Sequence, residues 1–291
     1  MKLNFRMKII MMLISVCLTL LGSEMLLRWL DPWGMYYFWD VADLWNKAQT
    51  HPNRIAVLPP GTYQFHGWTA TQLEDFTRKV PASQGGPCTV VFVGDSFTWG
   101  HGVDDDEVWV NRVAEQLDGT TVINAGLDQY NSENVLRTLN DFPDADLFVY
   151  LVIGNDANYT ISVTRQPKTS FLKMYLVYGA YYLTSGNSTG TMPEDGSDDL
   201  ADSNQGETKY DDLPRFQADI AALAADGRVI FFGFHNPLSE SLVPDYPITL
   251  IPSGGDTLSV VDRHPAPNGH RLMAEAMLPT IQAAVAERCP Q

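Results

Sequence analysis

Apolar and polar positions divide the chain into an apolar N-terminal segment, an irregular stretch and a long regular region. In the regular region, short apolar runs rich in β-branched and aromatic residues predict buried strands at 89–93, 121–123, 147–153 and 229–234. Apolar residues at helical spacing predict helices at about 106–117, 132–139, 170–183, 213–225 and 268–287. Strands that alternate with helices indicate a parallel sheet with helices on both faces. The sequence therefore predicts an α/β sandwich over residues 87–291.

The N-terminal segment, residues 1–30, has the pattern of a membrane anchor. Three basic residues precede an uncharged apolar run from Ile9 to Ser23, and apolar residues past Glu24 extend it towards the roughly 20 residues of a spanning helix. Gly22 and Ser23 are small, but the residues two positions before them are both leucine, which disfavours signal cleavage. We therefore predict an uncleaved anchor rather than a removed signal peptide. The basic flank predicts a cytoplasmic N-terminus, with the rest of the chain on the extracytoplasmic side of the cell membrane.

Residues 31–86 form an irregular lead-in to the regular region, rich in tryptophan, tyrosine and proline. Its aromatic residues, Trp33 and 36–39, are typical of the interfacial belt beside a membrane span, and we expect the lead-in to pack partly on the main domain. A second departure from regularity lies at about 186–212, which holds eight acidic residues against Lys209. The spacing differs from that of an EF-hand loop, so a flexible acidic insertion is favoured over a calcium site.

The chain has 19 basic and 35 acidic residues in 291, a formal net charge of −16. This acidic balance argues against sequence-independent nucleic-acid binding, and against docking on anionic lipids through a basic surface. Two cysteines, Cys88 and Cys289, lie at opposite ends of the regular region. In an oxidising compartment they could form a disulfide that ties the ends of the domain together; two buried free thiols are the alternative.

Polar residues with catalytic potential follow the predicted strands. Ser96 lies in Gly-Asp-Ser directly after the first strand, Gly126 follows the second strand, and Asn155 follows the third. The carboxyl ends of parallel strands share one edge of the sheet, where open α/β sheets bind their ligands. Asp262 and His264 come just before the last helix. We therefore expect these five residues to meet at one site.

These residue types offer the parts of an ester-cleaving site. A serine hydroxyl becomes nucleophilic when a base takes its proton, and His264 can do so near neutral pH. Asp262 can hold the imidazole in the required tautomer and stabilise its protonated form. The backbone N–H groups of Ser96 and Gly126, with the side-chain amide of Asn155, can stabilise an oxyanion. Each residue alone also fits a helix cap or a turn, but all of them at matched positions favour catalysis.

Taken together, the motifs resemble the SGNH (GDSL) hydrolase superfamily, in its membrane-anchored bacterial form. The family blocks occur in order: Gly-Asp-Ser at Ser96, a glycine at Gly126, Gly-Asn-Asp at Asn155, and Asp-Arg-His from Asp262 to His264. The last two blocks are each one residue shorter than the family pattern. The resemblance covers about residues 89–287 outside the acidic insertion. It implies a three-layer α/β/α fold with a flavodoxin-like sheet, and ester hydrolysis or acyl transfer without a metal or organic cofactor.

We therefore predict an exported, membrane-tethered serine esterase that works through an acyl-enzyme. Its location suggests O-acyl, chiefly acetyl, esters of cell-surface carbohydrate as substrates. An O-acyltransferase acting on polysaccharide and a non-catalytic glycan-binding envelope protein are the alternatives, and a lipase or thioesterase would prefer long acyl chains. Arg263, beside the base, and His235, after the fourth strand, are predicted substrate contacts. His101 is interpreted as a surface residue or substrate contact, and His270 as a packing residue.

Overall fold

A parallel five-stranded sheet forms the centre of the computed structural model, which describes residues 4–159, 167–184, 212–252, 255–259 and 261–289. The strands are β5 (Cys88–Val93), β6 (Thr120–Asn124), β7 (Leu147–Val152), β8 (Val229–Phe234) and β9 (Ile248–Ile251). Their order is β6-β5-β7-β8-β9, with all neighbours parallel. This is the flavodoxin-like order, so the expected sheet is confirmed. The sequence pattern does not predict β9, because a strand of four residues is too short to stand out.

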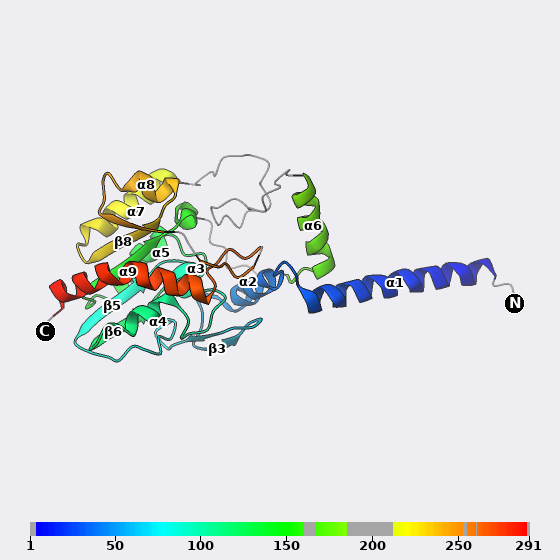
Figure 1. Cartoon of the computed structure of the whole chain (residues 1–291), viewed down its shortest axis with the longest axis horizontal. Coiled ribbons are helices and arrows are strands. Elements are labelled where there is room, and N and C mark those ends of the chain that lie inside the picture. The colour runs from blue at the N-terminus through cyan, green and yellow to red at the C-terminus, as the bar shows by residue number, and fades with distance from the viewer. Residues whose placement is uncertain (1–3, 160–166, 185–211, 253–254, 260, 290–291) are drawn as a thin grey trace.

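Helices cover both faces of this sheet, which confirms the three-layer α/β/α sandwich (Figure 1). Helices α4 (Trp109–Ala114) and α9 (Pro267–Arg288) pack together over one face, and α5 (Ser132–Thr138) and α7 (Leu213–Ala225) over the other. Shorter helical segments are α3 (Ser96–Trp99), η1 (Leu139–Asp141), η2 (Gly154–Ala157) and α8 (Pro237–Leu242). A further helix, α6 (Phe171–Thr184), lies outside the sandwich and matches the prediction for 170–183.

Strand β7 illustrates how one apolar run builds two cores. All six of its residues are buried. Its odd-numbered residues, from Leu147 to Leu151, belong to the core under α4 and α9, and its even-numbered residues, from Phe148 to Val152, to the core under α5 and α7. Side chains alternate across a strand, so a continuous apolar run serves both layers. Full burial of side chains of this size contributes about 1.5–3 kcal/mol each.

A disulfide between Cys88 and Cys289 joins the first strand of the sheet to the residue that follows α9. The two Cα atoms lie 5.3 Å apart, and the cysteines are 201 residues apart in sequence. Of the two alternatives that the sequence leaves open, the structure has the disulfide rather than free thiols. The bond therefore closes nearly the whole α/β domain into one covalent loop.

Reducing this disulfide should lower the free energy of unfolding by about 2–5 kcal/mol, because a cross-link over a long loop restricts the unfolded chain. Urea unfolding of the wild type and of the Cys88→Ser/Cys289→Ser variant, each with and without reductant, measures the effect. Reductant should destabilise the wild type only. A wild type whose unfolding midpoint is insensitive to reductant, with both thiols open to alkylation, would show that the bond does not form.

The lead-in is a regular, folded part of the domain, so the prediction of an irregular stretch is wrong. Helix α2 (Tyr36–Lys47) buries Tyr37, Val41, Leu44 and Trp45 at helical spacing. Two antiparallel hairpins follow, formed by β1 (Gln49–His51) with β2 (Ile55–Val57) and by β3 (Gly61–Gln64) with β4 (Thr69–Gln72). The buried side chains of α2 share one apolar cluster with residues that follow β5 and β6. The lead-in therefore packs on the sheet edge that carries the predicted site.

The same packing involves the aromatic residues at 33–39, whose predicted place in an interfacial belt beside a membrane stays a prediction. Tyr37 is buried, and the other aromatic side chains of this stretch are partly buried against protein. Phe38 and Trp39, for example, contact Tyr178 and Phe171 of α6. These aromatic residues join the lead-in to the rest of the chain, because their rings pack against other protein side chains.

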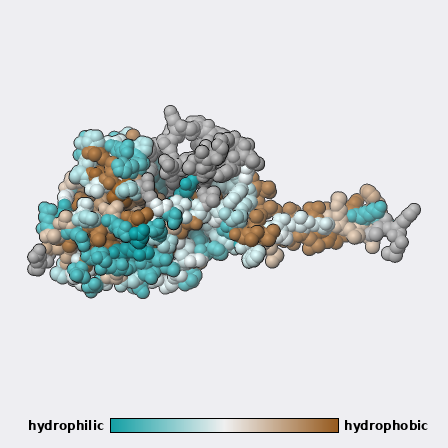
Figure 2. Space-filling model, in the orientation of Figure 1, coloured by the Kyte–Doolittle hydropathy of each residue, from teal (hydrophilic) through white to brown (hydrophobic). Residues whose placement is uncertain are grey.

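Helix α1 (Phe5–Leu30) projects from one end of the domain (Figure 1). It is long and apolar enough to span a membrane, and none of its residues is buried. Figure 2 shows it as a mostly apolar rod whose colour continues onto the end of the domain from which it emerges. The predicted anchor therefore has the length and composition that a spanning helix needs.

Nearly all of the predicted acidic insertion, 186–212, lies outside the described residues. Its last residue, Asp212, caps α7, because its side chain accepts the Arg215 N–H at 3.1 Å. An aspartate at this position satisfies a free backbone donor and complements the helix dipole.

Candidate active site

A sharp turn at the carboxyl end of β5 positions Ser96. Gly94 has a φ of +148°, and a Cβ at this position would lie 2.5 Å from the Thr98 hydroxyl, so the turn requires glycine. Asp95 then caps the short helix α3, with its Oδ1 accepting the Phe97 N–H at 3.0 Å. Ser96 is the first residue of α3 and lies beside the β5–β7 switch point, where this sheet order places ligands.

Asp262 and His264 reach Ser96 from the loop that precedes α9. His264 Nε2 lies 2.7 Å from Ser96 Oγ, and His264 Nδ1 lies 2.7 Å from Asp262 Oδ1. The His264 backbone N–H also donates to Asp262 Oδ1 at 3.0 Å, a contact that their spacing of two residues allows. The Ser259 hydroxyl holds the loop by accepting the Asp262 N–H at 2.9 Å. The structure therefore brings Ser96, His264 and Asp262 into one continuous hydrogen-bonded chain.

Burial and charge act in opposite directions on the ionisable groups of the site. Burial disfavours a charged imidazole, but the hydrogen-bonded Asp262 carboxylate, together with the charges of Asp128 and Asp95, raises the pKa of His264 to about 9. Burial also opposes the charge on Asp262, yet His264 outweighs it and holds the pKa of that carboxyl below its usual value. Burial raises the pKa of Asp95 to about 6, although His264 opposes this rise. The resting site at neutral pH therefore contains a protonated imidazole.

This protonation state explains the two partners of the Ser96 hydroxyl. Ser96 Oγ donates to Asp95 Oδ2 at 3.0 Å and lies 2.7 Å from His264 Nε2. While His264 is protonated, its Nε2–H donates to Oγ, and the hydroxyl proton is directed to Asp95. Once His264 is neutral, Nε2 can accept the hydroxyl proton, and this arrangement activates a serine. Activity should therefore rise with pH as His264 loses its proton.

Of the three predicted oxyanion donors, the Ser96 N–H lies at the start of α3 after β5, and its contact with an oxyanion stays a prediction. The other two, Gly126 and Asn155, lie at the ends of the strands on either side of β5. The Gly126 N–H, after β6, donates to Asn124 Oδ1 at 3.1 Å, so it must share or exchange this partner to bind an oxyanion. Asn155 lies in η2 after β7, and its side chain hydrogen-bonds to the Asp95 carboxylate. The contact of either group with an oxyanion stays a prediction.

The Gly126→Ala substitution should lower esterase activity by about 10²–10³-fold, the loss typical of one oxyanion donor. A Cβ at Gly126 would lie 2.8 Å from the Trp99 backbone nitrogen and 3.0 Å from the Thr98 side chain, so the turn must move away from α3. Turnover of a small aryl ester measures the loss. Gly179→Ala is the control, because its Cβ would meet Trp33 at an ordinary 3.8 Å. Equal activity of the two variants would contradict the requirement for glycine at 126.

Aromatic rings enclose the catalytic imidazole. The ring centroids of Tyr37, Phe97 and His101 lie 5.7, 5.3 and 4.7 Å from that of His264. Ser96 is 3% exposed and His264 is 9% exposed. Tyr37 belongs to α2, so the lead-in supplies one wall of the site. No local sequence signal predicts this contact, because it depends on how distant elements pack.

The interpretation of His101 as a surface residue is wrong, because its side chain is 1% exposed. Burial, with the nearby charge of His264, lowers the pKa of His101 to about 3, so the ring is neutral. The ring stacks on His264 and also contacts Trp68 and Tyr37. His101 therefore packs against the base and cannot compete with it for the serine proton, which agrees with the choice of His264 as base.

Arg78, from the end of the lead-in, holds the loop that follows α3. Its buried guanidinium donates to the carbonyl oxygens of Trp99 and Val103 at 2.7 and 2.6 Å, and to Asp105 at 2.9 Å. A buried charge is stable only with such partners. Sequence reasoning misses this residue, because a single arginine in a polar stretch carries no motif.

The other predicted site residues lie farther from the reacting atoms. Arg263, between the base and its carboxylate partner, is partly buried. His235 is exposed, and its Nδ1 lies 3.4 Å from a Glu240 carboxylate oxygen rather than at the triad. Their roles as substrate contacts stay predictions. His270 is buried and its Nδ1 accepts the Trp109 N–H at 3.3 Å, so its packing role is confirmed.

A metal ion is a second possible use of part of this cluster. His101, Asp262 and His264 present ligand atoms within 4.8 Å of one another. However, Nδ1 of His264 bonds to Asp262 and Nε2 bonds to Ser96, so neither ring nitrogen is directed at a common ion position. The chemistry of a hydrogen-bonded triad therefore fits these donors better than metal ligation.

Fold and site together define a class: an α/β sandwich with a Ser-His-Asp site of the serine-hydrolase kind at the carboxyl edge of its sheet. A solved structure from Veillonella parvula DSM 2008, a member of the lipolytic protein G-D-S-L family, is similar over 67% of this chain and 98% of its own, with 13% identity and a TM-score of 0.38. A carbohydrate acetylesterase family member from Sinorhizobium meliloti is similar over 68% and 99%, with 17% identity and a TM-score of 0.37.

A third similar structure is the M. smegmatis aryl esterase, which matches 68% of this chain and 99% of its own, with 12% identity and a TM-score of 0.40. No protein-family model and no curated protein matches the chain.

Proposed function

We propose that this chain is an exported, membrane-tethered serine esterase of the SGNH (GDSL) kind that works through an acyl-enzyme. The observation that carries the proposal is the chain of contacts from Ser96 Oγ through His264 to Asp262, with both contacts at 2.7 Å. Serine-based acyl transfer requires this order of nucleophile, base and orienting carboxylate. A protein that only binds glycan has no physical need for it, so catalysis is favoured over the binding alternative.

The geometry supports a two-step reaction. Neutral His264 takes the hydroxyl proton as Ser96 Oγ attacks the ester carbonyl, and the tetrahedral oxyanion is stabilised by the donors near Gly126 and Asn155. The intermediate collapses, the imidazolium returns its proton to the leaving alcohol, and an acyl-serine remains. Water then attacks with His264 again as base, which releases the acid and restores the hydroxyl. Asp262 stabilises the imidazolium in both steps.

We infer that the acyl group is short. Ser96 is only 3% exposed, and the rings of Tyr37, Phe97 and His101 surround the imidazole that contacts it. An acetyl group needs little space in such an enclosed site, whereas a long acyl chain needs an extended apolar channel. This favours O-acetyl esters over lipase or thioesterase substrates. The membrane tether puts acylated cell-surface carbohydrate within reach, which supports a carbohydrate alcohol component.

Two features support export of the catalytic domain. Arg6 and Lys8 lie in the first turn of α1, ahead of its uncharged apolar run from Ile9, and positive residues at this end of a spanning helix are retained on the cytoplasmic side. The disulfide between Cys88 and Cys289 is of a kind that persists in oxidising compartments. We therefore place the domain on the extracytoplasmic face of the membrane.

A substrate panel tests the proposal. Full-length protein in detergent or nanodiscs is offered p-nitrophenyl esters of increasing acyl length and O-acetylated polysaccharides, with the Ser96→Ala variant as the blank. We expect release of acetate from both acetyl substrates and falling kcat/KM as the acyl chain lengthens. A preference for long chains would overturn the acyl assignment. Acetyl transfer to an added sugar, in place of release, would identify the O-acyltransferase alternative.

A further inference from the structure

Helix α6 is apolar on two opposite sides. Phe171, Met174 and Tyr178 pack into the protein against residues that include Met35 and Val261. The opposite side is exposed and carries the apolar residues Leu176, Val177 and Ala180, with Lys173 one turn before them. Leu176 is 65% exposed and Val177 is 56% exposed. A surface helix in water normally pairs one apolar face with a polar one, so the outer side of α6 is suited to an apolar environment.

The start of α6 is fixed to the end of α1. The Glu24 carboxylate accepts the N–H groups of Phe171 and Leu172 at 3.0 and 2.8 Å, and so caps α6. Arg28 Nε donates to the same carboxylate at 2.8 Å. Farther along, the Tyr175 hydroxyl donates to Asp31 at 2.9 Å. These contacts fix where α6 lies relative to the membrane-spanning candidate.

The arrangement places α6 at the level where α1 leaves the bilayer. At about 1.5 Å per residue, the 26 residues of α1 extend about 39 Å, beyond the about 30 Å of a hydrocarbon core. The last turns of α1 therefore reach the interface. In Figure 1, α6 runs across the axis of α1 and lies at the end of the domain from which α1 projects.

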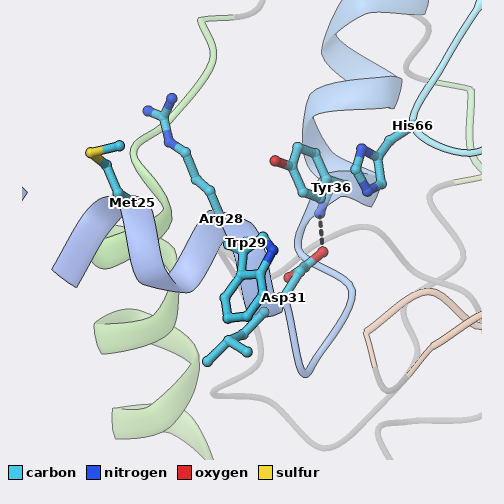
Figure 3. Close-up of a pocket in the computed structure, with 7 residues that line it drawn as sticks. Met25, Arg28, Trp29, Asp31, Tyr36 and His66 are labelled. Carbon is cyan, nitrogen blue, oxygen red and sulfur yellow. Dashed lines mark hydrogen bonds between the residues drawn. The ribbon is translucent and has the colours of Figure 1, made fainter. Parts of the chain in front are cut away.

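The side chains at the end of α1, beside α6, are also apolar and exposed. Trp29 and Leu30, in the last turn of α1, are 80% and 55% exposed. They line a hollow of about 630 Å³ together with Arg28 and Tyr36. Figure 3 shows Arg28 and Trp29 projecting from the end of α1, beside the ribbon of α6. An exposed tryptophan at the end of an apolar helix is typical of the interfacial region. The apolar surface of α1 therefore continues onto α6.

We propose that α6 is an interfacial helix that lies on the bilayer into which α1 inserts, with Leu176, Val177 and Ala180 in contact with acyl chains. Lys173, at the N-terminal end of this stripe, would extend along the helix towards the headgroups. This inference rests on the proposed tether, because α1 holds α6 at the membrane surface and makes its docking intramolecular, so a small apolar stripe suffices. The domain would then have two fixed points on the membrane and a set orientation.

Docking of α6 would also bear on the catalytic loop. The buried side of α6 shares an apolar cluster with Val261, the residue before Asp262. The Val261 N–H donates to the Trp33 carbonyl oxygen at 3.3 Å, within the segment that leads away from α1. A helix held on the membrane thus braces the loop that carries the base and its carboxylate partner.

Nitroxide accessibility tests the inference in full-length protein that carries Cys17→Ser and is reconstituted in nanodiscs. A label is placed at one of three positions by Leu18→Cys on α1, Leu176→Cys on α6, or Val243→Cys after α8 as the matched exposed control. Power-saturation EPR compares collision with oxygen, which concentrates in lipid, and with a water-soluble nickel chelate. We expect labels at 18 and 176 to favour oxygen several-fold over the label at 243.

Each other outcome has a distinct meaning. In one outcome the label at 18 collides mainly with oxygen, but the label at 176 gives the same ratio of oxygen to nickel collisions as the label at 243. In that case α6 faces water, so this inference is overturned while the tether stands. If the label at 18 collides mainly with the nickel chelate, α1 does not lie in the bilayer and the proposed tether is overturned. Dipolar broadening between labels at 176 would assign the face to a second copy, and shielding from both reagents would assign it to another part of the chain. Activity on a soluble acetyl ester is measured separately, so it reports only on the proposed esterase.

Discussion

Replacing Ser96 with alanine should lower kcat for ester hydrolysis by about 10⁶-fold, the size of loss seen when a serine-hydrolase nucleophile is removed. The hydroxyl is the only atom group lost, and its oxygen is the one that contacts His264 Nε2 at 2.7 Å. Without the Ser96 hydroxyl no acyl-enzyme can form. The remaining activity is a slow direct attack of water on the bound ester. Steady-state hydrolysis of p-nitrophenyl acetate by full-length protein measures the effect.

Ser239→Ala is the matched control for this experiment. Ser239 is also a buried serine, and its hydroxyl has no hydrogen-bond partner among the described residues. Its removal should leave kcat within a few fold of the wild type. Thermal unfolding of both variants checks that each is folded. Hydrolysis by Ser96→Ala at the rate of the control would contradict the assignment of the nucleophile.

Replacing Asp262 with asparagine should lower kcat by about 10⁴-fold, because an amide favours the wrong imidazole tautomer. It should also shift the pH dependence. Only neutral His264 can accept the serine proton, so wild-type kcat/KM should rise with pH through about 9, the value to which Asp262 raises the pKa of His264 against the effect of burial. Without the carboxylate, burial prevails and the pKa of His264 falls. The kcat/KM of the variant should therefore level off at a lower pH than that of the wild type, and at a smaller maximum value.

The rate of phosphonylation by a fluorophosphonate, measured from pH 5 to pH 10, separates these two effects better than an ester that hydrolyses spontaneously in alkali. Asp256→Asn is the control, because Asp256 is exposed on the same loop. It should keep both the rate and the wild-type pH profile. An Asp262→Asn profile that rises through the same pH as the wild type would show that Asp262 does not set the pKa of the base.

The sequence predicts the sheet, and the meeting of Ser96, His264 and Asp262 at its edge, for related physical reasons. Strands buried on both faces must be continuous apolar runs, as in β7, and so they stand out from the surrounding chain. Parallel strands also bring their carboxyl ends to one edge, so Ser96 and Asn155 converge whatever the intervening loops do. Asp262 and His264 are only two residues apart, so the pair itself is local.

What the sequence does not predict depends on packing between distant segments. Helix α2 has apolar residues at helical spacing, but its aromatic residues beside an apolar anchor suggest a membrane interface instead. The position of Tyr37 against His264, and the burial of His101 against both of these rings, follow only once α2 lies over the strand ends. No sequence motif predicts the buried position of the Arg78 guanidinium, because its partners are mainly backbone carbonyl groups in another loop.

The most direct test of the central claim is covalent trapping of the nucleophile in folded full-length protein. A fluorophosphonate is added at alkaline pH, where His264 is neutral, and the modified residue is identified by mass spectrometry of the peptides. A single adduct on Ser96, formed in step with loss of esterase activity and absent from Ser96→Ala, is the predicted result. Loss of activity with the adduct on another residue, or an active enzyme that never acquires one, would contradict the serine-esterase assignment.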